Sequence, residues 1–174
     1  MVFQSGEQIV LSGHWGVQHA KLLHDGHILT WGTDDDTIRV WSPFGDLVRE
    51  YSHHTGAVVG VYELSEGQIL SWAEDASIRL WTYLPEEQQP YQQLNTDDLG
   101  EVVDLVSLSN DTFVSIHDDG FSYLWTVEGP RIGLLDNRVL GVRETSDNRL
   151  ISWGSTIKLW SLDGNLQIEF NGVT

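Results

Sequence analysis

Apolar residues along this chain recur in short alternating runs and not at the spacing of a helix. Four of these runs close on a tryptophan: TIRVW (37–41), SIRLW (77–81), FSYLW (121–125) and TIKLW (156–160). A second apolar run precedes each of them: ILTW (28–31), ILSW (69–72), FVSI (113–116) and LISW (150–153). Runs of this length and alternation are typical of β-strands. Because no helical pattern separates them, the chain is predicted to be all-β.

The spacing of the runs identifies an internal repeat. The closing tryptophans stand 40, 44 and 35 residues apart, a period that fits a four-stranded unit. Tight-turn pairs such as Asp25-Gly26 and Asp147-Asn148 precede the second runs, and a further apolar run such as VVGVYEL precedes each turn. Each unit is therefore predicted to be an antiparallel meander of strands a to d, apolar on both faces. Such sheets must stack on one another, which is the geometry of a β-propeller.

Hydrogen-bonding residues stand at repeating places around these strands. A His lies before strand a, a Ser or Thr on strand b, an Asp in the turn between strands b and c, and the Trp closes strand c. These residues are His14, Thr30, Asp35 and Trp41 in the first unit and His54, Ser71, Asp75 and Trp81 in the second. The pattern resembles the WD40 repeat family, across nearly the whole chain. The resemblance implies that these residues form a hydrogen-bonded network within each propeller blade.

The later units depart from this pattern. In the third unit Asp97 and Asp98 stand near the place of the His, and in the fourth the turn between strands b and c shortens to Gly154-Ser155. The network residues that remain are Ser115, Asp119 and Trp125 in the third unit and Ser152 and Trp160 in the fourth. We therefore expect the fourth blade to be the most easily loosened. The LSW sequence of strand b in the second unit is similar to repeats in bacterial WD proteins, so we expect a bacterial protein.

The repeat predicts a single WD40-type domain over residues 1–174, with blades at approximately 11–51, 52–94, 95–135 and 136–170. An extra outer strand is expected at 7–12. The chain therefore has one outer strand more than its four blades need, and its blades are fewer than the family's usual number of about seven. Both features suggest that the ring is completed by other blades. One hypothesis is a homodimer that makes an eight-bladed ring. The alternatives are a piece of a longer array, completed by other blades, and a closed four-bladed monomer.

The charge of the chain limits its partners. Twenty-six acidic and nine basic residues give a formal net charge of −17, which would repel nucleic acid and anionic lipid. No apolar run approaches the roughly 18 residues of a membrane span, and the first ten residues lack the pattern of a secretion signal. We therefore expect a cytoplasmic protein that binds neither nucleic acid nor membranes. Because residues 95–135 hold eight acidic residues and one base, a basic partner would dock there.

No cluster of reactive side chains in the sequence is better explained as a catalytic or metal site than as a structural feature of the fold. The chain has no cysteine, which excludes disulfides and thiolate sites. His24-Asp25-Gly26-His27 is interpreted as a turn and not as a metal clip, and Asp34 to Asp36 as turn residues and not as Ca²⁺ ligands. No phosphate-binding glycine loop or hydrolase motif is present. We expect no catalytic residue, cofactor or metal, and a protein that is not an enzyme.

Two functions of different classes remain. The first is a scaffold for protein–protein interaction, whose candidate surface residues are Trp15, Asp97, Asp98, Glu101 and Asp118. The second is a carbohydrate-binding, lectin-like propeller that uses Trp31, Trp72 and Trp153 as aromatic platforms. Because Ile116 replaces the tryptophan in the third unit, the scaffold is favoured, and these tryptophans are expected to pack between blades. A third and less favoured interpretation is that the chain is a sensor or regulatory fragment of a larger signalling protein.

Overall fold

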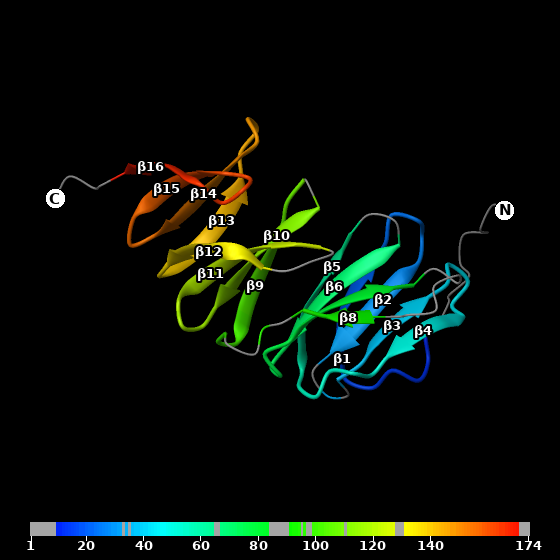
Figure 1. Cartoon of the computed structure of the whole chain (residues 1–174). Coiled ribbons are helices and arrows are strands. Elements are labelled where there is room, and N and C mark those ends of the chain that lie inside the picture. Colours follow the sequence, from blue (N-terminus) through cyan, green and yellow to red (C-terminus); the bar gives the residue numbers. More distant parts are fainter. Residues whose placement is uncertain are drawn as a thin grey trace.

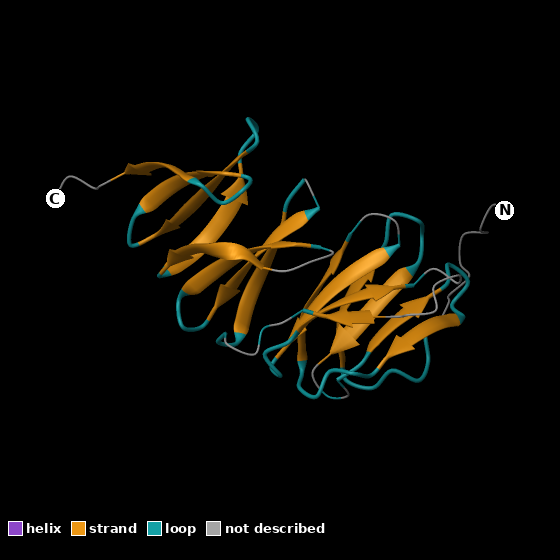
Figure 2. Ribbon diagram, viewed as in Figure 1, coloured by secondary structure: helices purple, strands orange, loops and turns teal. Residues whose placement is uncertain are grey.

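The structure is a computed structural model in which residues 10–32, 34, 36–64, 67–83, 91–94, 96, 99–109, 111–127 and 131–170 are described. This part of the chain forms strands and loops and no helix (Figure 2). It follows that none of its elements is a helix long and apolar enough to cross a membrane. The predicted all-β class is thereby confirmed.

Sixteen strands of the described chain form four antiparallel sheets of four strands, each in the order of the sequence. The first blade contains β1 (Val17–Leu22), β2 (Ile28–Gly32), β3 (Ile38–Trp41) and β4 (Leu47–Tyr51). The second contains β5 (Val58–Glu63), β6 (Gln68–Ala73), β7 (Ile78–Thr82) and β8 (Tyr91–Gln93). The third contains β9 (Val102–Ser107), β10 (Thr112–His117), β11 (Phe121–Thr126) and β12 (Arg131–Asn137). The fourth contains β13 (Val139–Glu144), β14 (Arg149–Gly154), β15 (Ile157–Ser161) and β16 (Leu166–Phe170).

The blades follow one another in chain order, and the first and the fourth blade lie at opposite ends of the array (Figure 1). The second strand of each of the first three blades contacts the first strand of the next one, as in the pairs β2 with β5 and β10 with β13, and β5 also contacts β9. The edge formed by the first strands is therefore the inner edge of the array. This is the arrangement of four WD40-type propeller blades, as predicted.

Three apolar clusters join the blades, one at each junction. We call the face of a blade that packs on the following blade its front face, and the opposite one its back face. At the first junction the front face contributes Leu29, Trp31, Ile38, Val40 and Tyr51, and the back face Val58, Val61, Ile69, Trp81 and Tyr83. The other two junctions repeat this arrangement with the equivalent strands. The core thus lies between the sheets, as expected for sheets that are apolar on both faces.

Glycine on strand a makes room for the tryptophan of strand b. Gly60 pairs with Trp72, and a Cβ atom added at Gly60 would overlap the indole ring. Gly141 and Trp153 repeat this pair in the fourth blade. The ring can therefore lie flat across the neighbouring strand and face the next blade.

The blade boundaries differ in two details from the sequence interpretation. The strand β12 extends to Asn137, two residues beyond the expected limit at 135, because Phe121 at the start of β11 pairs with Asn137. At the N-terminus, residues 10–12 do not belong to a strand, and the rest of the expected outer strand at 7–12 lies outside the described residues. In the fourth blade, the outer position is held by β16 of the same chain.

Replacing Gly60 by Ala is expected to destabilise the protein by about 1–3 kcal/mol, because the added methyl group must displace Trp72 from the junction. The matched control is Gly133→Ala, since a Cβ atom there meets no atom within 4 Å. Urea unfolding followed by circular dichroism measures both changes. Equal stability of the two variants would contradict the packing of Trp72 on Gly60.

Candidate functional site

A buried hydroxyl on strand b receives the indole N–H of strand c in every blade. The donor–acceptor distances are 2.8 Å for Trp41 to Thr30, 2.7 Å for Trp81 to Ser71, 2.8 Å for Trp125 to Ser115 and 2.9 Å for Trp160 to Ser152. These hydroxyl groups are buried, so the hydrogen bond to the indole satisfies a polar group that water does not reach. The bond also fixes the ring that forms the back face of each blade.

In the first blade the structure joins three of the four residues suggested by the family resemblance. His14 Nδ1 lies 2.7 Å from Thr30 Oγ1, which also accepts the Trp41 N–H. The other ring nitrogen of His14 lies 3.3 Å from Thr37 Oγ1. Asp35 lies outside the described residues.

In the second blade all four residues form one connected network. His54 Nε2 lies 2.7 Å from Ser71 Oγ, and His54 Nδ1 lies 3.1 Å from Asp75 Oδ2. Because the indole of Trp81 can only donate, the Ser71 hydroxyl donates to Nε2, and His54 donates its Nδ1 proton to Asp75. The histidine therefore bridges the strand b hydroxyl and the turn carboxylate.

The environment shifts the pKa of both ionisable groups in this network. Burial lowers the pKa of His54 below its usual range, and the Asp75 carboxylate offsets only part of this effect. For Asp75, burial alone would raise the pKa. Hydrogen bonds from the Ser77 hydroxyl and from the N–H groups of Thr55 and Ser77 outweigh it and bring the pKa to about 2. The neutral imidazole beside the ionised carboxylate is thus the stable state at neutral pH.

The third blade uses a histidine that the sequence interpretation missed. His117, the last residue of β10, lies with Nε2 2.8 Å from Ser115 Oγ and Nδ1 2.6 Å from the carbonyl oxygen of Gly100. It thereby takes the place of the histidine expected before strand a, where Asp97 and Asp98 lie outside the described residues. Asp119 instead accepts the N–H of Phe121 and stabilises its own turn.

These networks lie largely within the sheets, so they stabilise the blades and offer little surface to a partner. Exposed side chains gather instead along the inner edge, where strand a carries a bulge at the same place in each blade. The bulged residues are Gln18, Val59, Val103 and Leu140. They are exposed, Leu140 to 80%. A bulge adds one residue that has no opposite residue in the neighbouring strand and turns its side chain out of the sheet, which explains the exposed apolar side chains of Val59, Val103 and Leu140.

An open cleft of about 540 Å³ lies on this edge between the third and fourth blades. Val103 and Leu140 provide apolar lining, and Asp104 and Asp118 add carboxylates on the third blade. Arg138 is the basic residue among those that line it. The cleft therefore combines an apolar surface with negative charge from the third blade, the part of the chain with the greatest acidic excess.

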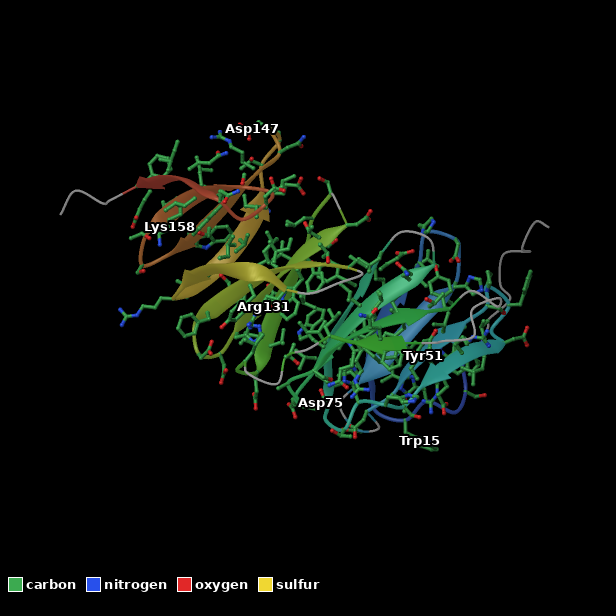
Figure 3. The ribbon with its side chains drawn as sticks, in the orientation of Figure 1. Trp15, Tyr51, Asp75, Arg131, Asp147 and Lys158 are labelled. Atoms are coloured by element: carbon green, nitrogen blue, oxygen red, sulfur yellow. The ribbon has the colours of Figure 1, made fainter. Side chains whose placement is uncertain are left out.

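Of the predicted surface residues, Asp118 lines this cleft, and Glu101 is its backbone hydrogen-bond partner. The N–H of Asp118 donates to the carbonyl oxygen of Glu101 at 3.0 Å, and both side chains are exposed. Trp15 is 83% exposed and points away from the ribbon of the first blade (Figure 3). It belongs to another blade and does not line the cleft. The sequence pointed to the acidic carboxylates, whereas the apolar residues Val103 and Leu140 were missed.

The tryptophans of strand b do not form equivalent exposed platforms. Trp31 and Trp72 are only 9% and 7% exposed because they belong to the first two junctions, whereas Trp153 is 41% exposed. A carbohydrate site repeated in each blade would need such rings at the surface of each unit. The structure therefore offers no support for the lectin-like alternative.

The turn that resembles a metal clip makes contacts within the fold. His24 lies 2.6 Å from Glu63 of the second blade, and Asp25 accepts the hydroxyl of Tyr83 at 3.2 Å. His27 packs beside the Tyr83 ring. Within the described ranges, no group of three or more His, Asp or Glu residues could hold a metal ion. The turn therefore connects the first two blades.

Sequence comparison finds WD-repeat relatives among curated proteins. The ribosome biogenesis protein YTM1 of Candida glabrata is 27% identical over 135 residues, which cover 75% of this chain and 24% of that protein. The periodic tryptophan protein 2 of Arabidopsis thaliana is 26% identical over 152 residues, 79% of this chain and 16% of that protein. The chain thus spans a quarter or less of these relatives. They come from a yeast and a plant and give no support to the expected bacterial character. No family model matches the chain.

Solved structures show the same fold. The designed Ika8 protein superposes with a TM-score of 0.69 at 22% identity and covers 92% of this chain and 50% of its own. The designed Ika4 protein gives 0.67 at 21% identity, covering 91% of this chain and 99% of its own. The WD40 β-propeller domain of Doa1 superposes with a TM-score of 0.63 at 23% identity, and the superposition covers 92% of this chain and 55% of that chain. Likeness at this identity establishes the WD40-type propeller fold.

Replacing Asp75 by Asn should destabilise the protein by about 2 kcal/mol at pH 7 and should remove part of its sensitivity to acid. Because the folded-state pKa lies below the unfolded one, the carboxylate stabilises the fold above about pH 4, and this contribution disappears as the pH falls toward 2. Urea unfolding at pH 7, 5 and 3 measures the effect.

The control for this prediction is Asp119→Asn, because Asp119 accepts a hydrogen bond within its own turn and is exposed. Its loss is expected to be small, about 0.5 kcal/mol, at each pH. If the free energies of unfolding of the Asp75 variant and the wild type differed by the same amount at all three pH values, the low pKa of Asp75 would be refuted.

Proposed function

We propose that this chain is a non-enzymatic scaffold for protein–protein interaction, in which the cleft between the third and fourth blades binds an extended segment of a partner. The observation that carries the proposal is the inner edge, where bulged apolar side chains stand beside exposed carboxylates. Between neighbouring blades the sheet faces form the junctions, so loops and edges are the surfaces left there for binding.

The chemistry of the cleft selects the kind of segment. Val103 and Leu140, 55% and 80% exposed, would bury apolar side chains of the partner. Asp104 and Asp118 would pair with Lys or Arg residues that flank the apolar side chains of the partner. The net charge of −17 would speed the approach of a basic partner. We therefore propose a basic segment that carries at least one large apolar residue.

The relatives support a role in assemblies of proteins. YTM1 is named as a ribosome biogenesis protein, and this process is where a partner of the present chain is to be sought first. The match covers a quarter of YTM1, so the proposal concerns the propeller region and not the activity of a whole relative. A cytoplasmic location, expected from the sequence, is part of the same proposal.

The assembly that presents this cleft is also part of the proposal. Self-association into a homodimer would give an eight-bladed ring, whereas blades from a longer chain or from another protein would complete it in a different way. The superposition covers half of the designed Ika8 protein and just over half of the Doa1 propeller domain, which supports the view that four blades are part of a ring, whereas it covers 99% of the designed Ika4 protein.

Synthetic peptides that alternate Lys or Arg with Leu or Phe should bind the chain with micromolar dissociation constants that rise with salt, as measured by fluorescence anisotropy. Matched peptides with Glu in place of the basic residues should not bind. Replacing Leu140 by Ser is expected to weaken binding about tenfold, because it removes the exposed apolar side chain without changing the charge of the cleft. Asp118→Lys should weaken it through repulsion of the basic residues.

The control variant is Asp163→Lys, which makes the same change of charge at an exposed turn residue that does not line this cleft. Equal weakening by Asp118→Lys and Asp163→Lys would show that binding follows net charge and not the cleft. A glycan array probed in parallel tests the lectin-like alternative, and strong competable binding there would overturn the scaffold proposal.

A further inference from the structure

The front face of the fourth blade is composed like a blade junction but carries no blade among the described residues. Neighbouring side chains on strands b, c and d form a row across this face. In the first two blades the equivalent row is covered by the next blade. The exposed fractions are 9%, 0% and 3% for Trp31, Ile38 and Tyr51, and 7%, 0% and 2% for Trp72, Ile78 and Leu94. They are 41%, 45% and 49% for Trp153, Ile157 and Phe170.

Trp153 already has the geometry of a junction residue. Its ring lies over Gly141 in the way that the ring of Trp72 lies over Gly60, and a Cβ atom at either glycine would overlap the ring. In the second blade this arrangement presents the tryptophan to the third blade, where it is buried. In the fourth blade the same arrangement presents Trp153 to solvent. The apolar face is therefore specifically shaped and not a chance exposure.

The back face of the first blade is open in a complementary way. Val17 begins strand a and is 42% exposed, whereas its equivalents Val58, Val102 and Val139 are 1%, 3% and 5% exposed. Ala20 is likewise exposed, and its equivalent in the second blade, Val61, is buried. On the same face Trp41 is 3% exposed, so the opening lies along strand a, where the equivalent residues of the other blades meet the preceding blade.

We infer that the front face of the fourth blade packs on the back face of the first blade of a second copy of this chain, and that two such junctions close an eight-bladed ring. The inference rests on the self-association part of the proposed function and assigns its faces. Each of the three junctions within the chain joins a front face to a back face. The two open faces are one of each kind, so two copies satisfy both by a twofold axis.

One chain cannot close these faces on itself in the observed arrangement. The first and the fourth blade lie at opposite ends of the array (Figure 1). The superposition covers 50% of the designed Ika8 protein, so that chain is about twice as long as the part that matches these four blades. Because each copy carries a net charge of −17, the two chains repel one another, and salt strengthens their association by screening.

Sedimentation velocity of the whole 174-residue chain tests this inference. The wild type is expected to sediment with twice the mass of one chain at micromolar concentration, more completely as salt is raised. Ile157→Lys on the open front face and Val17→Lys on the open back face should each raise the dimer dissociation constant about 100-fold, since each buries an unpaired charge. The matched control is Val59→Lys, because Val59 is 41% exposed on the inner edge and belongs to neither face. Circular dichroism establishes that each variant is folded.

Mixing the two variants gives a test that unfolding cannot imitate. A pair of one Val17→Lys chain and one Ile157→Lys chain contains one junction without any substitution, so mixing should restore part of the dimer. Packing of like faces predicts a different result, because Val17→Lys would then leave a junction between two fourth blades intact.

The possible outcomes separate the inference from the proposed function. A wild-type chain that is monomeric at micromolar concentration and high salt overturns both self-association and the assigned faces. A dimer that survives both substitutions, or that the control disrupts equally, overturns the faces and leaves self-association in place. A mass of three or more chains overturns the closed pair. Peptide binding at the cleft is measured independently and decides the scaffold role in each case.

Discussion

Each sheet of this protein has apolar side chains on both faces, and the rest of the structure depends on covering them. At the first junction Tyr51 packs against Trp81 with ring centroids 4.6 Å apart and donates its hydroxyl to the carbonyl oxygen of Thr82 at 2.7 Å. A blade is therefore stabilised by its neighbours more than by itself, as in repeat proteins whose units bury their faces by stacking. The blades at the two ends have one neighbour each, and all five residues of β16 are exposed.

The same constraint decides where polar groups can be buried. Every blade buries a hydroxyl of strand b within its sheet, and this hydroxyl needs partners there because water is excluded. The second blade supplies His54 from the segment before strand a, and the third supplies His117 from the end of strand b. These histidines come from different sequence positions and perform the same task. What the fold requires is a partner for a buried oxygen, and the sequence can satisfy this requirement in more than one way.

Much of the fold could be predicted from the sequence because its signals are local. Alternation within five or six residues predicts a strand, and the spacing of Trp41 and Trp81 predicts the repeat. His117 could not be found in this way, since its role depends on how strand b turns at its end. The cleft was missed because the bulges at Val103 and Leu140 arise from the pairing of two strands. Trp72 and Trp153 stand in nearly identical sequences, and their exposure differs only because of their places in the array.

Packing of the faces leaves the edges of the blades as the part of the surface on which the units can differ. The inner edge carries Gln18, Val59, Val103 and Leu140 at equivalent places, so a partner lying along it meets a different side chain at each blade. The junctions need similar residues in each unit because they repeat one packing arrangement. The edge is free of this requirement, since these four side chains do not belong to the apolar clusters at the junctions. Specific recognition can therefore develop on the edge of a repetitive fold without weakening the junctions that hold it together.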